Sequence, residues 1–181
     1  DQIRNDLDGY YVLGNDIDLT EATRDGGELS TEASTCPQEF GWKSIRGFSG
    51  TLDGRGHSIE GLYQKNYIKC NNDAVNTTYH EWVNTGNGLF ASANGNLTIK
   101  NIVFEDFDIT CYDGNYNSEN CSVILSDYAS NSRNDSTVYN AKLENITVKN
   151  GSVKFQRGSG GGVFGELEND YGNITLSDIY V

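Results

Sequence analysis

Two pairs of aspartates are the residues best placed to do chemistry in this sequence of 181 residues. Asp16 and Asp18 form one pair, and Asp106 and Asp108 form the other. A spacing of two residues places both carboxylates of a pair on one face of a strand. A glycosidase needs two carboxylates that converge at about 5–10 Å. The alternative is that these carboxylates are solvated or bind turns. We expect the second role, so the sequence predicts no catalytic residue.

Other catalytic chemistries have less support. A polysaccharide lyase would need a calcium cluster and a basic residue as proton acceptor, but no spacing ties Arg55, Arg133 or Lys154 to acidic residues. His57 and His80 lie outside any H-E-x-x-H motif, so we expect surface or hydrogen-bonded histidines. No G-x-S-x-G elbow occurs, which leaves acyl transfer unsupported.

The segment from Cys111 to Cys121 alternates oxygen-bearing residues in the manner of a calcium loop. The oxygen ligands would be Asp113, Asn115, Asn117 and Glu119. They partly match the D-x-[DN]-x-[DN] start of such a loop, whose hard oxygen ligands suit Ca²⁺. The turn glycine is replaced by Ser118, and the closing glutamate is missing. We expect a polar loop pinned by a disulfide, with Ca²⁺ as the alternative and the only cofactor that the sequence suggests.

The four cysteines predict two disulfides. Cys36, Cys70, Cys111 and Cys121 lie in polar stretches and lack C-x-x-C spacing, which disfavours a zinc or redox centre. Three pairings are open, and the short loop between Cys111 and Cys121 favours a local bond, which leaves Cys36 with Cys70. Disulfides persist outside the reducing cytosol, so we expect an extracellular or cell-surface protein.

Asparagine sequons and loop tyrosines indicate the same kind of surface. Of seven N-x-[ST] sequons, those at Asn76, Asn120 and Asn134 lie in expected loops and are the candidates for glycosylation. The tyrosines that could present flat faces to a sugar or a neighbouring protein are Tyr67, Tyr79, Tyr112 and Tyr116. Ordinary packing of these tyrosines against the rest of the fold is the alternative.

Composition limits the fold and the partners. Only 36% of the residues are apolar, below the roughly 45–50% of a typical domain, so a thick core built from helices is disfavoured. We expect one domain over residues 1–181. The 26 acidic residues outnumber the 13 basic ones, which gives a net charge of −13 and disfavours nucleic acid as a partner. No apolar run of about 18 residues occurs, so we expect no membrane insertion of this segment.

A repeat organises these residues. Segments 96–104, 145–153 and 173–181 each place apolar residues two apart, then Asn or Asp, then a second apolar stretch. Such alternation predicts a strand with one buried face, and Asn or Asp between two runs predicts a corner, because both residues tolerate left-handed backbone angles. The corners would be Asn101, Asn150 and Asp178.

A second recurring element precedes the repeat. Gly88-Leu89-Phe90, Val123-Ile124-Leu125 and Gly162-Val163-Phe164 stand before the three segments, with insertions expected at about 21–41, 64–87, 111–121 and 127–140. Equivalent positions at regular intervals favour an all-β parallel solenoid with loop insertions, in which each coil buries its inner face against the next. A β-sandwich is the alternative, since closely spaced turn signals also suit it.

The order of these pieces resembles a known family. Residues 1–19, 42–45, 48–62 and 88–90 look like the start of GLUG-motif β-helix regions, found in filamentous-haemagglutinin-like adhesins and other microbial surface proteins. The resemblance implies a right-handed parallel β-helix without a shared active site. It also implies that the chain is a segment of a longer protein or the subunit of a polymer. Residues 51–57 are similar to a strand and turn of pectate-lyase-like enzymes, where the role matching Asp53 is architectural.

These observations give one leading hypothesis and two alternatives. The leading one is a non-catalytic structural or adhesive module of a microbial cell-surface protein or filament, in contact with neighbouring coils or subunits end to end. The first alternative is a β-helix enzyme that degrades polysaccharides, as a lyase or a glycoside hydrolase. The second is a carbohydrate-binding module. The external partner that we expect is a host or environmental glycan or a protein receptor.

Overall fold

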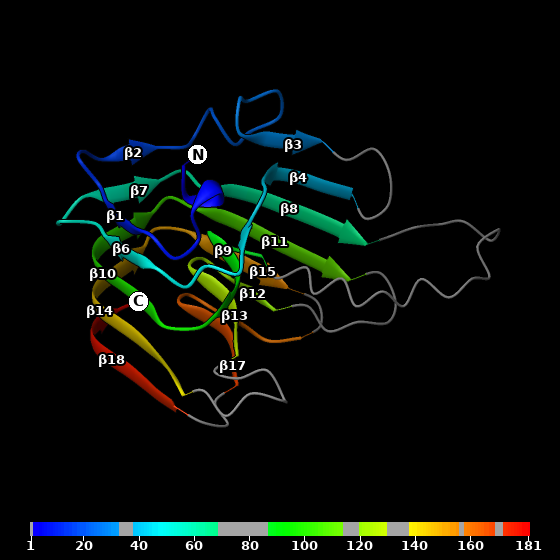
Figure 1. Ribbon diagram of the computed structural model, residues 1–181. Helices are drawn as coiled ribbons and strands as arrows, with labels where there is room; N and C mark the ends of the chain where they lie inside the picture. Colours follow the sequence, from blue (N-terminus) through cyan, green and yellow to red (C-terminus); the bar gives the residue numbers. More distant parts are fainter. Residues whose placement is uncertain are drawn as a thin grey trace.

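The chain is built almost entirely from strands. The computed structural model describes residues 2–32, 38–68, 87–113, 120–129, 138–155, 158–168 and 172–181, and every statement below concerns these residues. Apart from a short 3-10 turn, η1 (Ile3–Asn5), the regular elements are β-strands, and most neighbouring strands run parallel (Figure 1). The prediction of an all-β chain with parallel strands is confirmed. Parallel pairing also differs from the antiparallel sheets of a β-sandwich.

Three sheets are visited in a fixed order. The first sheet contains β1 (Tyr10–Val12), β2 (Ile17–Asp18), β6 (Thr51–Asp53), β7 (Ser58–Glu60), β10 (Leu97–Glu105), β14 (Tyr139–Lys149) and β18 (Gly172–Tyr180). The second contains β3 (Ser30–Glu32), β4 (Gln38–Trp42), β8 (Tyr63–Ile68), β11 (Asp108–Asp113) and β15 (Ser152–Phe155). The third contains β5 (Ile45–Arg46), β9 (Phe90–Asn94), β13 (Leu125–Ala129) and β17 (Phe164–Glu168). A pair of short strands, β12 (Cys121–Ser122) and β16 (Gly160–Gly161), connects the second sheet to the third.

One passage through the three sheets is here called a rung. Rung 1 contains β1, β2, β4 and β5; rung 2 contains β6, β7, β8 and β9; rung 3 contains β10, β11 and β13; rung 4 contains β14, β15 and β17. Strands of successive rungs pair in order within each sheet, and β18 adds a fifth level to the first sheet. The exceptions to parallel pairing are β3 with β4 and β4 with β8, which are antiparallel.

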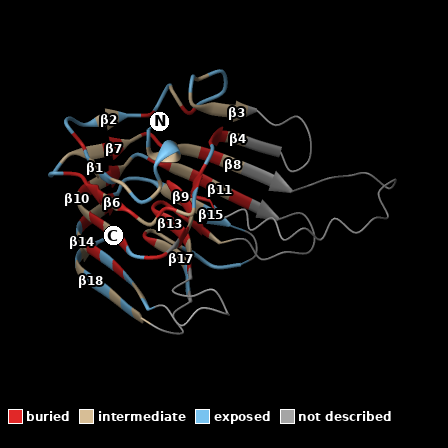
Figure 2. Cartoon of the chain, viewed as in Figure 1, coloured by how far each residue is buried: buried red, intermediate tan, exposed pale blue. Residues whose placement is uncertain are grey.

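Register places inward side chains in continuous columns. Leu52, Ile99 and Leu143 occupy directly paired positions of β6, β10 and β14, and they are 2%, 0% and 0% exposed. Each side chain in such a column is covered by the rungs above and below it as well as by the opposite sheets. The core is therefore a narrow band that runs along the stack (Figure 2), which explains how a chain with 36% apolar residues buries its apolar side chains.

The predicted corners adopt the expected backbone conformation. Asn101, Asn150 and Asp178 have φ angles of 53°, 55° and 53°. The corner equivalent to Asn101 in the second copy is however Asn145, with a φ angle of 51°, and Asn150 lies at the next bend, the level of Asp106. This left-handed region costs most residues about 1–2 kcal/mol, whereas the short polar side chains of Asn and Asp tolerate it. The bend between two inward-facing runs is thus encoded locally at each level.

The second copy of the repeat begins earlier than the sequence pattern predicts. Leu97 lies opposite Ala141, and Ala141 lies opposite Ile174. The segment equivalent to 96–104 is therefore 140–148, so the prediction of 145–153 was wrong, while 173–181 is aligned correctly. Asparagines at positions 140, 145 and 150 fit the pattern in two registers. The register found in the structure stacks both apolar runs onto those of β10, which the other register cannot do.

The second recurring element is aligned as predicted, but the insertions are narrower. Phe90, Leu125 and Phe164 are directly paired across β9, β13 and β17. Parts of the expected insertions instead belong to strands, namely β3 and β4, most of β8, the end of β11, the end of β13 and the start of β14. Polar and aromatic residues obscure the alternation in these strands, as in Tyr63–Ile68 of β8.

Candidate functional site

The first aspartate pair is divided between two separate turns. Asp16 Oδ1 accepts hydrogen bonds from the Ser58 N–H at 2.9 Å and from His57 Nδ1 at 3.0 Å. Asp18 Oδ1 accepts the N–H of Thr20 at 2.8 Å. The Ser58 N–H and then His57 hold the pKa of Asp16 below its ordinary value, and the Thr20 hydroxyl and N–H do the same for Asp18. Both carboxylates therefore stabilise local structure in their charged form, as a turn-binding role requires.

The second pair, Asp106 and Asp108, is also used for structure: one residue forms a bend and the other contacts a neighbouring strand. Asp106 has a φ angle of 53° at the corner before β11. Asp108 Oδ1 lies 3.0 Å from Ser152 Oγ and 3.8 Å from Lys154 Nζ, both on β15. The two side chains therefore have different tasks, one at a bend and one across a strand pair. These contacts do not form the convergent pair that a glycosidase uses.

Acidic side chains also gather in one column on the outside of the first sheet. Asp18, Glu60 and Glu105 are directly paired in successive strands, and Lys149 occupies the next position. Burial, together with the charges of Asp18, Glu105, Asp106 and Asp16, raises the pKa of Glu60. Lys149 Nζ lies 2.9 Å from Glu105 Oε2 and neutralises that end of the column. Within the part of the chain that the structure describes, no group of His, Cys, Asp and Glu is arranged to hold a metal ion.

Asp53 links three levels of the stack at one corner. Its Oδ1 accepts the N–H of Arg55 at 3.0 Å and the Nδ2 of Asn101 at 3.1 Å. Its Oδ2 lies 3.3 Å from the Tyr10 hydroxyl and 3.4 Å from Lys100 Nζ. The Arg55 N–H, and then Asn101 and Lys100, lower the pKa of Asp53. These contacts agree with the architectural role expected for this residue.

Two ladders of asparagines are a feature that the sequence reasoning missed. At the corner, Asn145 Nδ2 donates to Asn101 Oδ1 at 3.1 Å. At the start of the strands, Asn140 N–H donates to Asn96 Oδ1 at 3.0 Å, and Asn173 N–H donates to Asn140 Oδ1 at 3.1 Å. The signal was present as the recurring N-x₄-[ND] spacing, which marks two stacked columns in each copy of the repeat.

One of the two predicted disulfides lies within the described residues and is confirmed. Cys111 and Cys121 are bonded and join β11 to β12. Cys36 and Cys70 lie outside the described residues. Of the proposed calcium ligands, Asp113 ends β11 without a described side chain, and Asn115, Asn117 and Glu119 lie outside the described residues. Calcium binding therefore stays a prediction.

The structure describes some of the residues predicted for glycosylation and binding and leaves others outside the described ranges. Asn120 is half-buried before β12, and its Nδ2 donates to Glu166 Oε2 at 2.6 Å. Asn76, Asn134, Tyr79 and Tyr116 lie outside the described residues. The backbones of Tyr67 and Tyr112 are directly paired in β8 and β11, while their side chains are not described.

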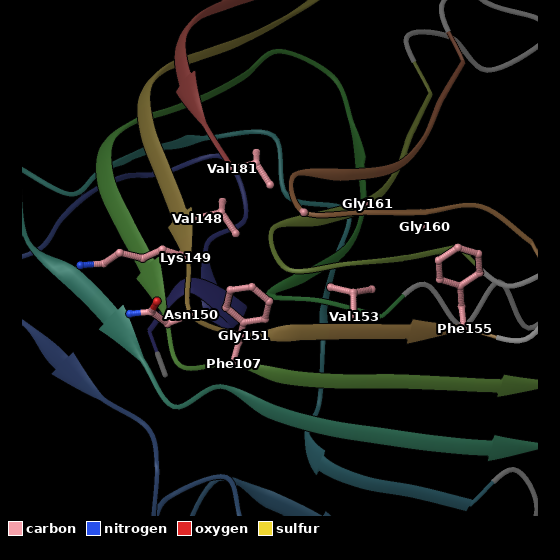
Figure 3. Close-up of a pocket in the computed structure, with 11 residues that line it drawn as sticks. Phe107, Val148, Lys149, Asn150, Gly151, Val153, Phe155, Gly160, Gly161 and Val181 are labelled. Carbon is pink, nitrogen blue, oxygen red and sulfur yellow. The ribbon is translucent and has the colours of Figure 1, made fainter.

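A hollow of 380 Å³ opens at the C-terminal end of the stack. Its walls come from β14 of the first sheet, from β15 of the second sheet, from the bend before β11, from the glycines of β16 and from the end of the chain (Figure 3); they include Phe107, Val148, Val153, Phe155, Gly161 and Val181. The side chains are largely apolar, with Lys149 and Asn150 at one side. This hollow is the open end of the core rather than a cleft lined with catalytic groups.

No protein-family model, no curated protein and no solved structure matches this chain. Among the described residues, no helix has the length and apolar character to cross a membrane.

Proposed function

We propose that the chain is a parallel β-helix module with a structural or adhesive role and no catalysis of its own. It would work outside the cell, in a microbial cell-surface protein or surface filament. The observation that carries the proposal is the unbroken register of the first sheet, in which β1, β6, β10, β14 and β18 pair in order. Stacked main-chain ladders of this kind resist bending and extension, because each strand is hydrogen-bonded to the next.

The polar groups support a mechanical role over a chemical one. Asp16, Asp18 and Asp108, three of the four aspartates with the best spacing for catalysis, each bind a turn or a neighbouring strand, and Asp53 does the same at its corner. The Cys111–Cys121 disulfide suits an oxidising, extracellular compartment. The net charge of −13 favours solubility of an extended surface.

Force spectroscopy on the single chain, held between protein handles at its two ends, tests this proposal. We expect successive partial unfolding events, each releasing about one rung. The length of a rung is the spacing between equivalent residues, which is 35 residues from Phe90 to Leu125 and 39 residues from Leu125 to Phe164. Reduction of Cys111–Cys121 is an internal control, because it frees a loop with a sequence separation of 10 that the oxidised chain keeps closed. One cooperative event for the whole chain would contradict the proposal. So would turnover of an acidic polysaccharide that is lost in Asp108→Asn.

Carbohydrate binding is the second candidate, and one observation favours it. The backbones of Tyr67 and Tyr112 occupy paired positions in adjacent strands, so the chain offers two tyrosine positions side by side, and tyrosine is a residue type that binds flat apolar faces such as those of sugars. A glycan array probed with the protein and with Tyr67→Ala/Tyr112→Ala tests it. Binding by the parent protein that disappears in the variant supports this function, and an array without a hit opposes it.

A further inference from the structure

The structure separates the N-x-[ST] sequons by the surroundings of their asparagine side chains. Five of the seven sequons lie within the described residues, with their asparagines at Asn96, Asn120, Asn145, Asn150 and Asn173. A sugar attached to an asparagine occupies the solvent around the side-chain nitrogen. The folded chain can therefore carry it best where that side chain faces water and has no partner that the fold needs. Four of the five asparagines have side chains that the fold already uses.

The three sequon asparagines of the repeat belong to the ladders. Asn145 Nδ2 donates to Asn101 Oδ1 at 3.1 Å, and Asn173 Nδ2 donates to Asn140 Oδ1 at 3.1 Å. Asn96 Oδ1 accepts the Asn140 N–H at 3.0 Å. Each of these side chains is directed towards a neighbouring strand, at the strand spacing of about 4.8 Å. A sugar on one of them would lie over the adjacent level and disturb the ladder.

Asn120 is held within the connection between the second and third sheets. It is half-buried, and its Nδ2 donates to Glu166 Oε2 at 2.6 Å. The middle residue of its sequon, Cys121, is bonded to Cys111, and the last residue, Ser122, is 0% exposed. The folded chain therefore offers less room for a sugar at Asn120 than the sequence suggests.

Asn150 differs from the other four asparagines. It is exposed at the bend between β14 and β15, where its φ angle is 55°. Its side chain makes no hydrogen bond within the part of the chain that the structure describes. Figure 3 shows its amide on the outer side of the bend, pointing away from the Phe107 ring and to the same side as Lys149. The side-chain nitrogen is thus in a position to carry a large substituent.

The exposure of this bend is a property of the corner and not of its level in the stack. Asp106 occupies the equivalent place one level earlier, because Glu105 pairs with Lys149. Asp106 has the chain on both sides, since the Gly61 N–H donates to Glu105 O at 3.1 Å and the Asp106 N–H donates to Lys149 O at 3.3 Å. Its side chain is exposed nonetheless. The exposure of Asn150 therefore does not depend on what lies beyond its own level.

The same comparison shows that the bend does not require an asparagine. Asp106 forms it with a φ angle of 53°, and residues 106–108 contain no sequon. Gly151 has a separate reason, because a Cβ there would lie 2.5 Å from the Phe107 ring. The amide of Asn150 therefore has no structural task at this bend.

We propose that Asn150 is the acceptor of an N-linked oligosaccharide. The donor would be an oligosaccharide joined through its anomeric carbon to a polyprenyl diphosphate. The Asn150 amide nitrogen forms a bond to that carbon and loses one proton, while the bond from the carbon to the diphosphate oxygen breaks and the lipid diphosphate leaves. No oxidant or reductant takes part. The inference rests on the extracellular location in the proposed function, since such transfer acts on exported chains.

Ser152 sets the order of modification and folding. Its hydroxyl completes the sequon, and in the folded chain this hydroxyl donates to Asp108 Oδ1 at 3.0 Å, from β15 to β11. A transferase that recognises the hydroxyl therefore acts before β15 pairs with β11. The folded chain then accommodates the product, because Asn150 stays at an exposed bend.

Mass spectrometry of the chain exported from eukaryotic cells tests the proposal. An amidase that releases N-linked oligosaccharides in heavy-oxygen water converts each occupied asparagine to a labelled aspartate. In the protein recovered from the medium, we expect the label at Asn150 and not at Asn96, Asn120, Asn145 or Asn173. Circular dichroism checks that the recovered protein is folded.

Variants at the two left-handed positions around the end of β14 assign the oligosaccharide. Asn150→Gly removes the acceptor and keeps the backbone conformation, so it should lose one oligosaccharide and remain folded. Asn145→Gly is the matched control, because it removes a sequon at the other left-handed position, and it should carry the same oligosaccharides as the parent. If Asn150→Gly is not exported, Ser152→Ala and Ser152→Thr replace it. The alanine variant should lose the oligosaccharide at Asn150, and the threonine variant, which keeps a hydroxyl, should retain it.

Three outcomes would overturn the proposal. The first is a folded, exported chain without a label at Asn150, and the second is an Asn150→Gly variant with the same oligosaccharides as the parent. The third is equal occupancy of Asn145 and Asn150, which would show that the ladder contacts do not select the acceptor. A chain without a label at Asn150 that still unfolds rung by rung under force would reject the site and leave the proposed function standing.

Discussion

Leu143 and Leu176 are the same residue type in the same column of adjacent strands, yet one is fully buried and the other is 49% exposed. Their local sequences are equally typical of a strand with one apolar face. The difference in exposure comes from position in the stack. Strands pair with β14, which carries Leu143, on both of its edges, whereas β18, which carries Leu176, is paired on one edge only among the described residues. In this fold a side chain is buried by the next level of the stack, so stability at an end depends on what covers that end.

The polar corner shows the same contrast. Asn101 donates to Asp53 on one side and accepts from Asn145 on the other. Asp178 continues this corner at the last level, with the same left-handed backbone, where no further rung of the described chain follows. The middle of the stack is therefore stabilised by contacts in both directions and the end by contacts in one.

Truncating the two leucines gives the largest expected difference. Leu143→Ala should lower the free energy of unfolding by about 3 kcal/mol, because it removes a fully buried side chain and leaves a cavity. Leu176→Ala should cost about 1 kcal/mol, since its side chain is half exposed and water can fill the space. Urea unfolding measures both values. Equal costs for the two variants would show that burial along the stack does not set local stability.

Alanine at the corner should produce the next largest difference. Asn101→Ala removes two side-chain hydrogen bonds worth about 0.5–1 kcal/mol each and adds about 1 kcal/mol of strain from a left-handed alanine, so we expect a loss of about 2–3 kcal/mol. Asp178→Ala should cost about 1 kcal/mol from strain alone.

The Asn101→Gly variant separates the two contributions at the corner. Glycine adopts the left-handed conformation freely, so this variant should lose only the hydrogen bonds. Thermal unfolding of the three variants measures the series. A glycine variant as stable as the parent would mean that the asparagine ladder contributes no net stability.

The general plan of the fold could be predicted from sequence, because it depends on patterns that each level carries by itself. Alternating apolar residues, left-handed Asn and Asp corners and the triplets at Phe90, Leu125 and Phe164 are all local signals. The register of the second repeat could not be predicted with the same reasoning, since the asparagines at 140, 145 and 150 fit two alignments. Only the simultaneous stacking of both apolar runs decides between them.

The candidate site was harder to predict for a related reason. The carboxylate spacing of Asp16 with Asp18 was visible, but the Ser58 N–H and the His57 side chain that occupy the Asp16 carboxylate come from a different rung. The first strands of the second sheet were also hidden, because β3 and β4 lie in a stretch that reads as an insertion. Contacts between distant parts of the chain decide what these polar residues do.

The smallest expected effect contrasts two carboxylates from different columns of the first sheet. The folded-state pKa of Asp53 is lowered by the Arg55 N–H, Asn101 and Lys100, so its contribution to stability is present above its unfolded pKa of about 3.9 and is lost as the pH falls through the folded value. The pKa of Glu60 is raised by burial and by acidic neighbours, so its contribution is present below its unfolded pKa of about 4.3 and is lost as the pH rises through the folded value. Urea midpoints at about pH 3 and pH 7 should therefore show that Asp53→Asn destabilises more at the higher pH, whereas Glu60→Gln is more favourable there. Stability relative to the parent that shifts in the same direction between pH 3 and pH 7 for both variants would contradict the prediction. It would mean that the Asp53 carboxylate is not attracted, or the Glu60 carboxylate not repelled, by its surroundings.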